Sequence, residues 1–413
     1  MNLSIKHYFY SLLFILPLIF VASCDKDDDD SNKEIIISPS ANAANEAQLA
    51  FIEAEDGTTI IFEEGEYDFT STLSIDGKNN IIIKGAGRDN TTLDFSGQTT
   101  GGDGVLATNC TNIRFEDITI QDSEGDALKT RDCDGVSFVN VATVWSGEPS
   151  EDNGAYGLYP VLCTEVYIDN CYAYGASDAG IYVGQSDKVI LKNSVAEGNV
   201  AGIEIENTTN ADVFDNEAFD NTGGILVFDL PGLTQYGENV RVFNNNSHDN
   251  NRTNFAPAGN IVGNVPAGTG CMILSTSNVE VFDNDFTEND FTGILVASYL
   301  IIDEPNDPGY NAFPTGIYLH DNTHTMTGSV DNVNQPSLIL DIIGLLESNS
   351  IEQPNIFTDG IYVVPTQICV QEGNASFVNL NIAADDTYQS IVTDASNHDC
   401  VKTALPEVVF TPF

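Results

Sequence analysis

The feature that most limits the possible folds of this sequence is a short motif that returns at a constant interval. The segment "DAGIYVGQS" at 178–186 is followed by "NVAGIEIEN" at 199–207 and "NTGGILVFD" at 221–229. Each copy has a glycine followed by apolar residues at alternate positions, and the copies lie about 22 residues apart. Alternation predicts a β-strand with one buried face. The fixed interval predicts that like strands stack, coil above coil.

A second alternating motif lies between the copies of the first. Its copies end at Asn140, Asn170, Asn193, Asn216, Asn245 and Asn284. Asparagine tolerates the left-handed backbone region and can hydrogen-bond to its copies in neighbouring coils. Two stacked strands per coil predict an all-β protein with a parallel β-helix, and the strong preference for right-handed crossovers makes this helix right-handed.

The repeat predicts a single solenoid with additions at its ends and corners. Residues 41–370 are expected to form the β-helix, capped at its N-terminal end by an amphipathic helix within 47–69. Residues 371–413 are expected to form a C-terminal cap. Cys369 and Cys400 belong to no coil repeat, so we expect a disulfide between them. Insertions at the corners are expected at about 146–155, 229–239, 250–268, 298–314 and 323–358.

The N-terminal segment has the pattern of an export signal. Lys6 and His7 precede the apolar run "FYSLLFILPLIFVAS", which is too short for a comfortable membrane span and ends at Cys24. "VASC" resembles the lipobox of bacterial lipoproteins. The resemblance implies a signal peptide at 1–23, lipidation of Cys24, and an acidic tether at 24–40. An ordinary signal peptide is the alternative. We therefore expect an outer-membrane lipoprotein of a Gram-negative bacterium, at the cell surface or else facing the periplasm.

The charge balance limits which molecules the protein can bind. The chain has 62 acidic and 14 basic residues, for a net charge of −48. Nucleic acid is excluded because its phosphates would be repelled. The five histidines lack the spacing of metal ligands, so no metal site is predicted, although acidic turns such as "DEPNDPG" at 303–309 leave calcium binding open. No cofactor is required.

The outward positions of the first strand supply the candidate site. One row down the stack consists of Leu106, Lys129, Tyr159, Tyr182, Glu204, Leu226, Met272 and Leu295. A neighbouring row has Arg131 and Glu206 in its middle coils. Coils lie ~4.8 Å apart, so the middle residues of both rows lie within reach of one ligand. The later coils are apolar outside, which predicts that the insertions at 250–268 and 298–314 cover them.

Several segments, including "NGAYGLYPVLCTEV" and "GASDAGIYVGQS", resemble a family of exported parallel β-helix repeat proteins. More distantly, the coils resemble the pectin-lyase-like superfamily, which includes polysaccharide lyases and alginate C5-epimerases. Those epimerases have an Asp-Pro-His motif after a Tyr-Gly pair. Here "YGLYPV" at 156–161 has Tyr159 and Val161 in place of the acid and the imidazole. This difference argues against an epimerase mechanism, while the wider resemblance implies a polysaccharide partner.

Sugar rings stack on tyrosines, and a uronate carboxylate pairs with lysine or arginine. We expect catalysis, if present, from Lys129, Tyr159 and Tyr182: the lysine would neutralise the carboxylate or act as base, and a tyrosine would donate the proton. Substrate binding is expected of Arg131, Tyr156, Asp178, Glu204 and Glu206. The alternative is a solvated ladder in which the two cations pair with Asp126, Asp132 or Glu204.

Two functions therefore remain open. In the first, a lipid-anchored exported protein binds, and cleaves or modifies, acidic polysaccharide in the manner of a lyase. In the second, the protein is a non-catalytic scaffold, adhesin or receptor, with an exported protein as its partner. The cysteines leave a further alternative: Cys110, Cys133 and Cys163 share one phase that Ser186 and Thr209 continue, so they form either a disulfide or a reduced buried column.

Overall fold

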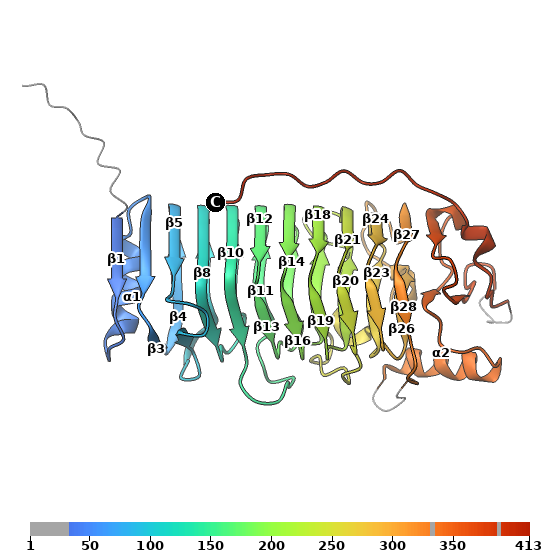
Figure 1. Cartoon of the computed structure of the whole chain (residues 1–413), viewed down its shortest axis with the longest axis horizontal. Helices are drawn as coiled ribbons and strands as arrows, with labels where there is room; N and C mark the ends of the chain where they lie inside the picture. The colour runs from blue at the N-terminus through green and yellow to red at the C-terminus, as the bar shows by residue number, and fades with distance from the viewer. Residues whose placement is uncertain (1–32, 331–334, 386–389) are drawn as a thin grey trace, which may run out of the picture. The chain divides into compact units, whose positions relative to one another are not determined.

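The computed structural model describes residues 33–330, 335–385 and 390–413. Within these residues the chain forms a parallel β-helix with two long sheets (Figure 1). The signal peptide, Cys24 and most of the predicted tether lie outside the described residues.

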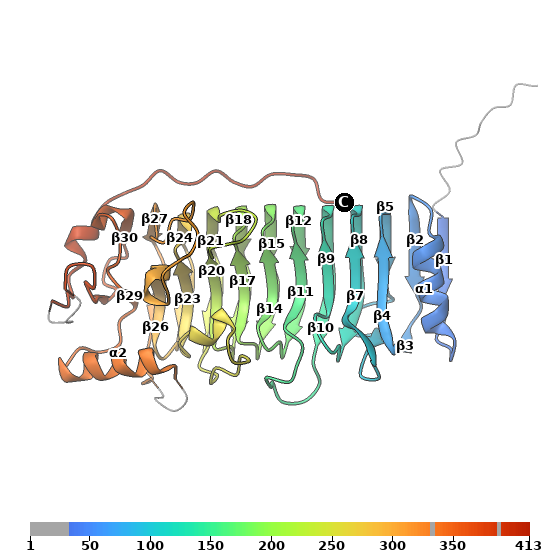
Figure 2. The ribbon, with the colours of Figure 1, turned by 180° about the vertical axis from the view of Figure 1, so that it is seen from behind.

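Sheet B contains the glycine motifs, and its strands follow one another along the solenoid (Figure 2). They are β4 (Ser71–Asp76), β7 (Thr100–Thr108), β9 (Leu128–Arg131), β11 (Tyr156–Val161), β14 (Ala179–Gly184), β17 (Ala201–Glu206), β20 (Gly223–Phe228), β23 (Thr269–Leu274), β26 (Thr292–Ala297), β29 (Ile356–Thr358) and β31 (Phe377–Asn379). The parallel register aligns Ile181, Ile203 and Ile225 in one inward column, where all three are fully buried. This confirms the stacking predicted from the repeat.

Sheet A contains the second motif and covers two faces of each coil. The first face has β1 (Lys33–Ile37), β2 (Thr58–Phe62), β5 (Asn79–Lys84), β8 (Thr111–Gln121), β10 (Asp134–Val144), β12 (Thr164–Asp169), β15 (Asp187–Lys192), β18 (Thr209–Phe214), β21 (Glu238–Phe243), β24 (Ser277–Phe282), β27 (Ile317–His320) and β30 (Ile368–Gln371). The second face has β3 (Gly65–Asp68), β6 (Thr91–Asp94), β13 (Tyr172–Tyr174), β16 (Val195–Glu197), β19 (Glu217–Phe219), β22 (Asn246–His248), β25 (Asp285–Thr287) and β28 (Thr323–Thr325). β8 and β10 are long enough to contribute to both faces.

In the described ranges, helices are few and lie at the ends of the solenoid and in the insertions. They are α1 (Ala43–Glu53), α2 (Ser337–Ser348) and the short 3₁₀ helices η1 (Ile261–Asn264), η2 (Tyr299–Ile301), η3 (Pro365–Gln367) and η4 (Ala395–His398). α1 caps the N-terminal end as expected, with Phe51 fully buried. Lys78 Nζ donates to the carbonyls of Ile52 and Ala54 at 2.7 and 2.8 Å, which satisfies free acceptors at the C-terminal end of α1. In the part of the chain that the structure describes, no helix is long and apolar enough to cross a membrane.

The boundaries of the solenoid differ from those predicted. β1 pairs with β2 in register, so the β-helix already includes Lys33–Ile37, before residue 41. At the other end β31 pairs with β29, so the coils continue beyond residue 370. The short apolar run "EIII" that forms β1 lies next to the acidic segment, and its strand character was therefore missed.

The C-terminal segment does more than cap the last coil. A disulfide joins Cys369 to Cys400, the pair expected from the sequence. Beyond it the chain turns back and runs along sheet A (Figure 1). The backbone N–H of Leu405 donates to Glu280 at 2.9 Å, and that of Val408 donates to Asp212 at 3.1 Å. Residues 371–413 are therefore a cap followed by a long strap, because buried carboxylates on the outer face of sheet A bind the strap backbone.

The predicted asparagine series merges two structural positions. Asn140, Asn170 and Asn193 adopt the left-handed backbone, with φ of 53°, 56° and 51°. The register of β15 and β18 aligns Lys192 with Phe214, so the next left-handed position is Asp215 and not Asn216. From Asn216 onward the predicted series is therefore wrong by one residue. Both Asp and Asn tolerate this backbone region, so the letters alone do not reveal the shift.

The displaced asparagines form a buried ladder inside the solenoid. The backbone N–H and the Nδ2 of Asn216 both donate to Oδ1 of Asn245 at 3.0 Å, and Asn245 bonds in the same way to Asn284. The ladder continues through Asn322 and ends at the Glu372 carboxylate. A second ladder consists of Asn199, Asn221, Asn250 and Asn289. Each amide satisfies its neighbour, which removes the cost of burying polar groups.

The three aligned cysteines Cys110, Cys133 and Cys163 are free and buried, which is the reduced column of the two alternatives. The column continues through Ser186 to Thr208, whose hydroxyl accepts from the Ser186 N–H at 3.2 Å. It does not continue to Thr209, because the Thr209 hydroxyl instead donates to Asp187 at the surface.

The ladder generates a stability prediction. Asn245→Ala removes the acceptor of the Asn216 backbone N–H and of one Nδ2 hydrogen of Asn216, and it removes the amide that donates to the Val213 carbonyl. We expect a loss of about 2–5 kcal/mol and a melting temperature lower by about 2–6 °C. Asn246→Ala, at the exposed neighbouring position, is the control and should shift the melting temperature by less than about 2 °C. Equal melting temperatures for the two variants would contradict the ladder.

Candidate functional site

The outward rows of sheet B form as predicted. The register aligns Tyr159 with Lys129 and Tyr182 with Glu204. It then aligns Leu226, Met272 and Leu295 along the later coils. The middle and later coils therefore differ in chemistry along one continuous face.

The later coils are covered, as their apolar outward residues indicated. Leu226, Met272 and Leu295 are at most 5% exposed. Phe255 and Ile261 from the insertion at 250–268, and Tyr299 and Ile301 from that at 298–314, pack against this face. The cover also includes α2, which the sequence analysis missed. The signal was present in "SLILDIIGLLES", because Ile339, Ile342, Ile343 and Leu346 recur at helical spacing and are buried.

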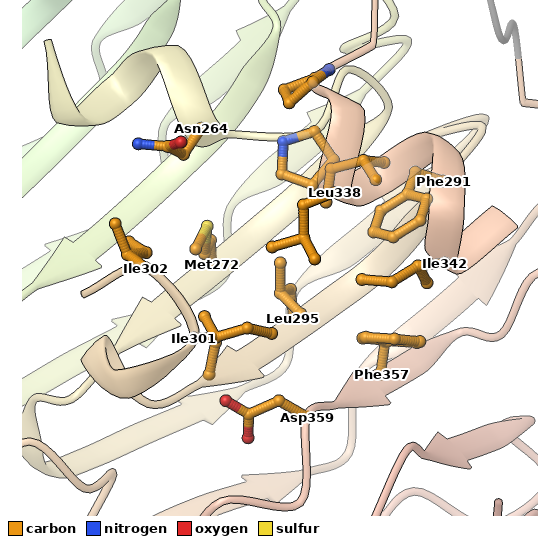
Figure 3. Close-up of a pocket in the computed structure, with 14 residues that line it drawn as sticks. Asn264, Met272, Phe291, Leu295, Ile301, Ile302, Leu338, Ile342, Phe357 and Asp359 are labelled. Carbon is orange, nitrogen blue, oxygen red and sulfur yellow. The ribbon is translucent and has the colours of Figure 1, made fainter. Parts of the chain in front are cut away.

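A cleft of about 350 Å³ remains between α2, η2 and these coils (Figure 3). Its lining is mostly apolar, with Met272, Leu295 and Phe357 from the sheet. Asp359 lies at its edge and accepts the backbone N–H groups of Ser298 and Ile361 at 2.7 and 2.8 Å. Burial raises the pKa of Asp359 to about 7. Because the protein itself uses both Asp359 oxygens, the cleft lacks the convergent polar groups of a typical ligand site.

Three tyrosines gather on the outward face of the middle coils. The ring centroids of Tyr156, Tyr159 and Tyr182 lie 4.5–4.9 Å apart. Tyr182 is buried, whereas the other two are half-buried. Burial, followed by nearby carboxylates, raises the pKa of all three phenols. They are therefore neutral hydrogen-bond donors and apolar surfaces, not bases.

Three carboxyl groups lie against the tyrosines. Tyr182 donates to Glu206 at 2.6 Å, and Tyr156 donates to Asp178 at 3.4 Å. Burial, and then the charge of Glu206, raise the pKa of Asp178 to about 7. Burial also raises the pKa of Glu206, and that of Glu204 rises well above its ordinary value. Glu204 is 1% exposed, and its Oε2 has no hydrogen-bond partner among the described residues. Burial of this kind favours the protonated acid.

The insertion at 250–268 covers the part of the sheet B face around Tyr182 and Asp178. Asn260, in the insertion at 250–268, donates its Nδ2 to Asp178 at 3.1 Å. Val262 and Val265 of the same insertion pack in one apolar cluster with Tyr182 and Leu226. The insertion therefore explains the burial of Tyr182, Glu204 and Asp178. Loop paths are not encoded in the repeat, so the sequence did not predict which outward residues would be closed off.

The two cations of the face are already paired. Lys129 Nζ lies 2.9 Å from Asp126 Oδ2, 3.9 Å from Asp103 Oδ1, and 4.5 Å from the centroid of the Tyr159 ring. Burial raises the pKa of Asp126 to about 6, although Lys129 opposes the shift. Arg131 is exposed, and its Nε lies 3.2 Å from Asp132. These pairs match the ladder considered as the alternative in the sequence analysis, and Asp103 is its unforeseen member.

The structure thus brings the predicted site residues onto one face, but only some of them are accessible to a ligand. Lys129, Tyr159 and Glu206 are half-buried, and Arg131 is exposed. These residues form the open end of the face. Tyr182, Glu204 and Asp178 are at most 5% exposed. In the structure described, these three can shape the open end but cannot touch a polymer.

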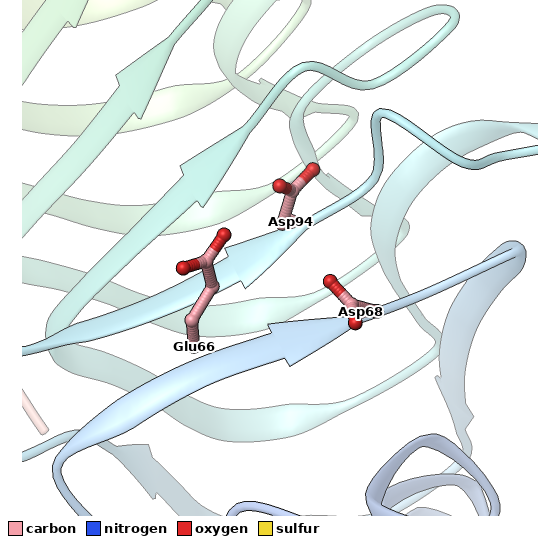
Figure 4. A group of neighbouring side chains, drawn as sticks. All are labelled: Glu66, Asp68 and Asp94. Carbon is pink, nitrogen blue, oxygen red and sulfur yellow. The ribbon is translucent and has the colours of Figure 1, made fainter. Parts of the chain in front are cut away.

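Among the residues that the structure describes, one candidate cation cluster is present, and it lies away from this face. Glu66, Asp68 and Asp94 of β3 and β6 place ligand atoms within 4.8 Å of one another (Figure 4). Asp94 Oδ1 already accepts from the Ser96 N–H at 2.7 Å. Three carboxylates are fewer than the six to eight oxygens that calcium takes. In the 303–309 turn, Asp307 accepts from Gly232, Gly309 and Tyr236, so it fastens two insertions together.

Comparison with known proteins establishes the family. A model of the right-handed β-helix region matches residues 45–229 and 150–303. The chain therefore belongs to the right-handed β-helix family. A search of curated proteins found no match.

Several solved structures are similar in fold. The A-module of a mannuronan C-5 epimerase from Azotobacter vinelandii is 14% identical over 71% of this chain and 94% of that chain, with a TM-score of 0.45. The polygalacturonase from Erwinia carotovora ssp. carotovora is 11% identical over 74% of this chain and 96% of that one, with a TM-score of 0.47. An alginate lyase from Paenibacillus is 13% identical over 72% and 99%, with a TM-score of 0.30.

The buried acid generates a pH prediction. Above the ordinary glutamate pKa, the unfolded state loses the proton of Glu204 while the folded state keeps it, so rising pH favours unfolding. Glu204→Gln cannot ionise. We expect this variant to lose less stability than wild type between pH 5 and pH 8, by about 2–4 °C in melting temperature.

Glu238→Gln is the matched control, because it removes one charge at an exposed position of β21. It should retain the pH dependence of wild type. If Glu204→Gln shows that same dependence, Glu204 is ionised in the folded state and the assignment is wrong.

Proposed function

We propose that this protein binds polysaccharide at the open end of the sheet B face, and that Glu206 transfers a proton to or from the bound chain. The observation that supports this proposal most directly is the environment of Glu206. Its carboxyl group is half-buried, has a raised pKa, and accepts from Tyr182 beside the tyrosine cluster. A carboxyl group with a raised pKa beside a surface where a ligand can bind is suited to proton transfer.

The neighbours of Glu206 fit a sugar ligand. Tyr159 offers part of its ring at the surface, and Arg131 adds exposed N–H donors. Aromatic faces with a few polar groups are the usual composition of ligand sites. The buried Glu204 and Asp178 would act indirectly, by shaping the surface beside Glu206, whose own burial raises its pKa.

Lys129 and the tyrosines take different roles from those expected of a lyase. Lys129 is held by Asp126, and the tyrosines have raised pKa values. Abstraction of a proton by either is therefore disfavoured, and the proton transfer passes to Glu206. The sequence analysis expected an acidic polysaccharide. Whether the bound polysaccharide is charged depends on the ion pairs that Lys129 and Arg131 already make.

The non-catalytic scaffold, adhesin or receptor remains the second candidate. The observation that favours it is the closure of the face over Tyr182, Glu204 and Asp178. A binding module needs only the surface of the open end, whereas an enzyme also needs Glu206. The two functions are therefore separated by substitution of Glu206.

A panel of neutral and anionic polysaccharides, assayed for new reducing ends, tests catalysis. We expect Glu206→Gln to lower turnover at least ~100-fold while binding changes little, because the amide keeps the shape but supplies no proton. Tyr159→Ala should weaken binding by about tenfold through loss of a stacking surface. Glu238→Gln is the control and should match wild type. Binding without turnover in wild type would establish the scaffold, and no binding at all would refute the proposal.

We also propose that the chain is anchored in the outer membrane through a lipid on Cys24, with the solenoid displayed at the cell surface. The support is the lipobox-like "VASC" before an acidic segment. Cys24→Ala should move the protein from the membrane to the soluble fraction, because no acyl chain can then be attached. The melting temperature should not change, because Cys24 precedes the first strand. A variant that stays in the membrane fraction would refute the anchor.

A further inference from the structure

The open end of the sheet B face has more carboxylates than available cations. Lys129 is the cation nearest to Tyr159, and two carboxylates lie within 4 Å of its ammonium group. Arg131 is paired with Asp132 from its own turn. A carboxylated sugar would have to displace one of these partners, and the displaced carboxylate would stay in the same site. The net Coulomb gain would then be small.

The carboxyl groups deeper in the face do not supply charge of the other sign. Glu204 is buried without a partner for Oε2, and Glu206 accepts from Tyr182. An ammonium group on a sugar could not reach Glu204, because that side chain is 1% exposed, and it would have to compete with Tyr182 for Glu206. The face is therefore built from neutral tyrosine donors, carboxyl groups that are buried or already hydrogen-bonded, and internally paired cations.

The charge of the whole chain has the same effect over a longer range. A net charge of −48 creates a negative potential that slows the approach of any polyanion. An uncharged polymer is unaffected by this potential. Two effects therefore disfavour a polyanion: the negative potential of the whole chain, which acts at a distance, and the pairing of the cations in the site, which acts on contact. Salt strongly screens only the first effect, so the two effects have different salt dependence.

We propose that the glycan bound by this site is uncharged, and that Asp126 determines this specificity by neutralising Lys129. This inference rests on the proposed function. It replaces the acidic polysaccharide expected from the sequence, which required a free lysine. Asp126 is a specificity residue here, because it acts on the ligand through Lys129.

The test compares two probes that share a backbone: a galacturonate trisaccharide and its full methyl ester, titrated by calorimetry. We expect wild type to bind the ester at least about tenfold more tightly than the acid. In Asp126→Asn, Lys129 loses its nearest carboxylate, so affinity for the acid should rise several-fold while affinity for the ester changes less than about twofold.

Glu238→Gln is the matched control, because it removes the same charge from an exposed position outside the face. It should leave the ratio of the two affinities unchanged. Measurement in low and moderate salt separates long-range repulsion, which salt weakens, from the effect of the Asp126 pair, which persists.

The inference is overturned if wild type prefers the acid, if Asp126→Asn leaves the preference as in wild type, or if no uncharged glycan binds in this pair or in the panel. The proposed function is a separate matter. It fails only when no glycan of either kind binds, so the two failures are distinguishable.

Discussion

Hydrogen bonding between parallel strands holds each coil against the next at a spacing of ~4.8 Å, and this register determines the neighbours of every side chain. Ile203 lies between Ile181 and Ile225 because their strands pair in phase. The same register stacks Phe214, Phe243 and Phe282 on the outer face of sheet A, with centroids 4.8 and 4.9 Å apart. A side chain that packs well against an identical side chain in the next coil is therefore stabilised in each coil, and the solenoid can extend by repetition.

Inside the solenoid, polar side chains can stack in successive coils in the same way only when they both donate and accept hydrogen bonds. Asparagine meets this requirement, and the ladder through Asn216, Asn245 and Asn284 closes every amide bond before ending at a carboxylate. Glu204, on the outward face of sheet B, lacks a matching neighbour of this kind. Glu204 is aligned with Tyr182 on one side and Leu226 on the other, so its buried oxygen has no copy to bond. Such an unpaired acid costs stability, and this cost is typical of residues retained for function.

The sequence was sufficient for those parts of the fold that follow from alternation and period. The inward column at Ile203 and the outward row from Lys129 to Leu295 could be predicted because each depends on one residue's place in its own repeat. The apolar outward residues of the later coils also predicted that other segments of the chain cover them. The shift at Asn216 was not predictable, because aspartate and asparagine are equally suited to the left-handed turn before it.

The site was less predictable because access depends on segments outside the repeat. The path of the insertion that carries Asn260 decides that Asp178 and Glu204 are closed off. The strap along sheet A likewise depends on contacts as distant in sequence as Val408 and Asp212. In contrast, the pairing of Lys129 with Asp126 could be considered from the sequence, because the two residues are only three positions apart. Local pairs were visible from the sequence, whereas long-range closure was not.

The central claim is that the open end of the sheet B face, and no other surface, is where a glycan binds. A crystal structure of the protein with a bound uncharged oligosaccharide tests this claim most directly. The account predicts a sugar ring against Tyr159 with an oxygen within hydrogen-bond distance of Glu206, and Lys129 still paired with Asp126. An oligosaccharide bound instead in the cleft beneath α2, or on the outer face of sheet A, would contradict it.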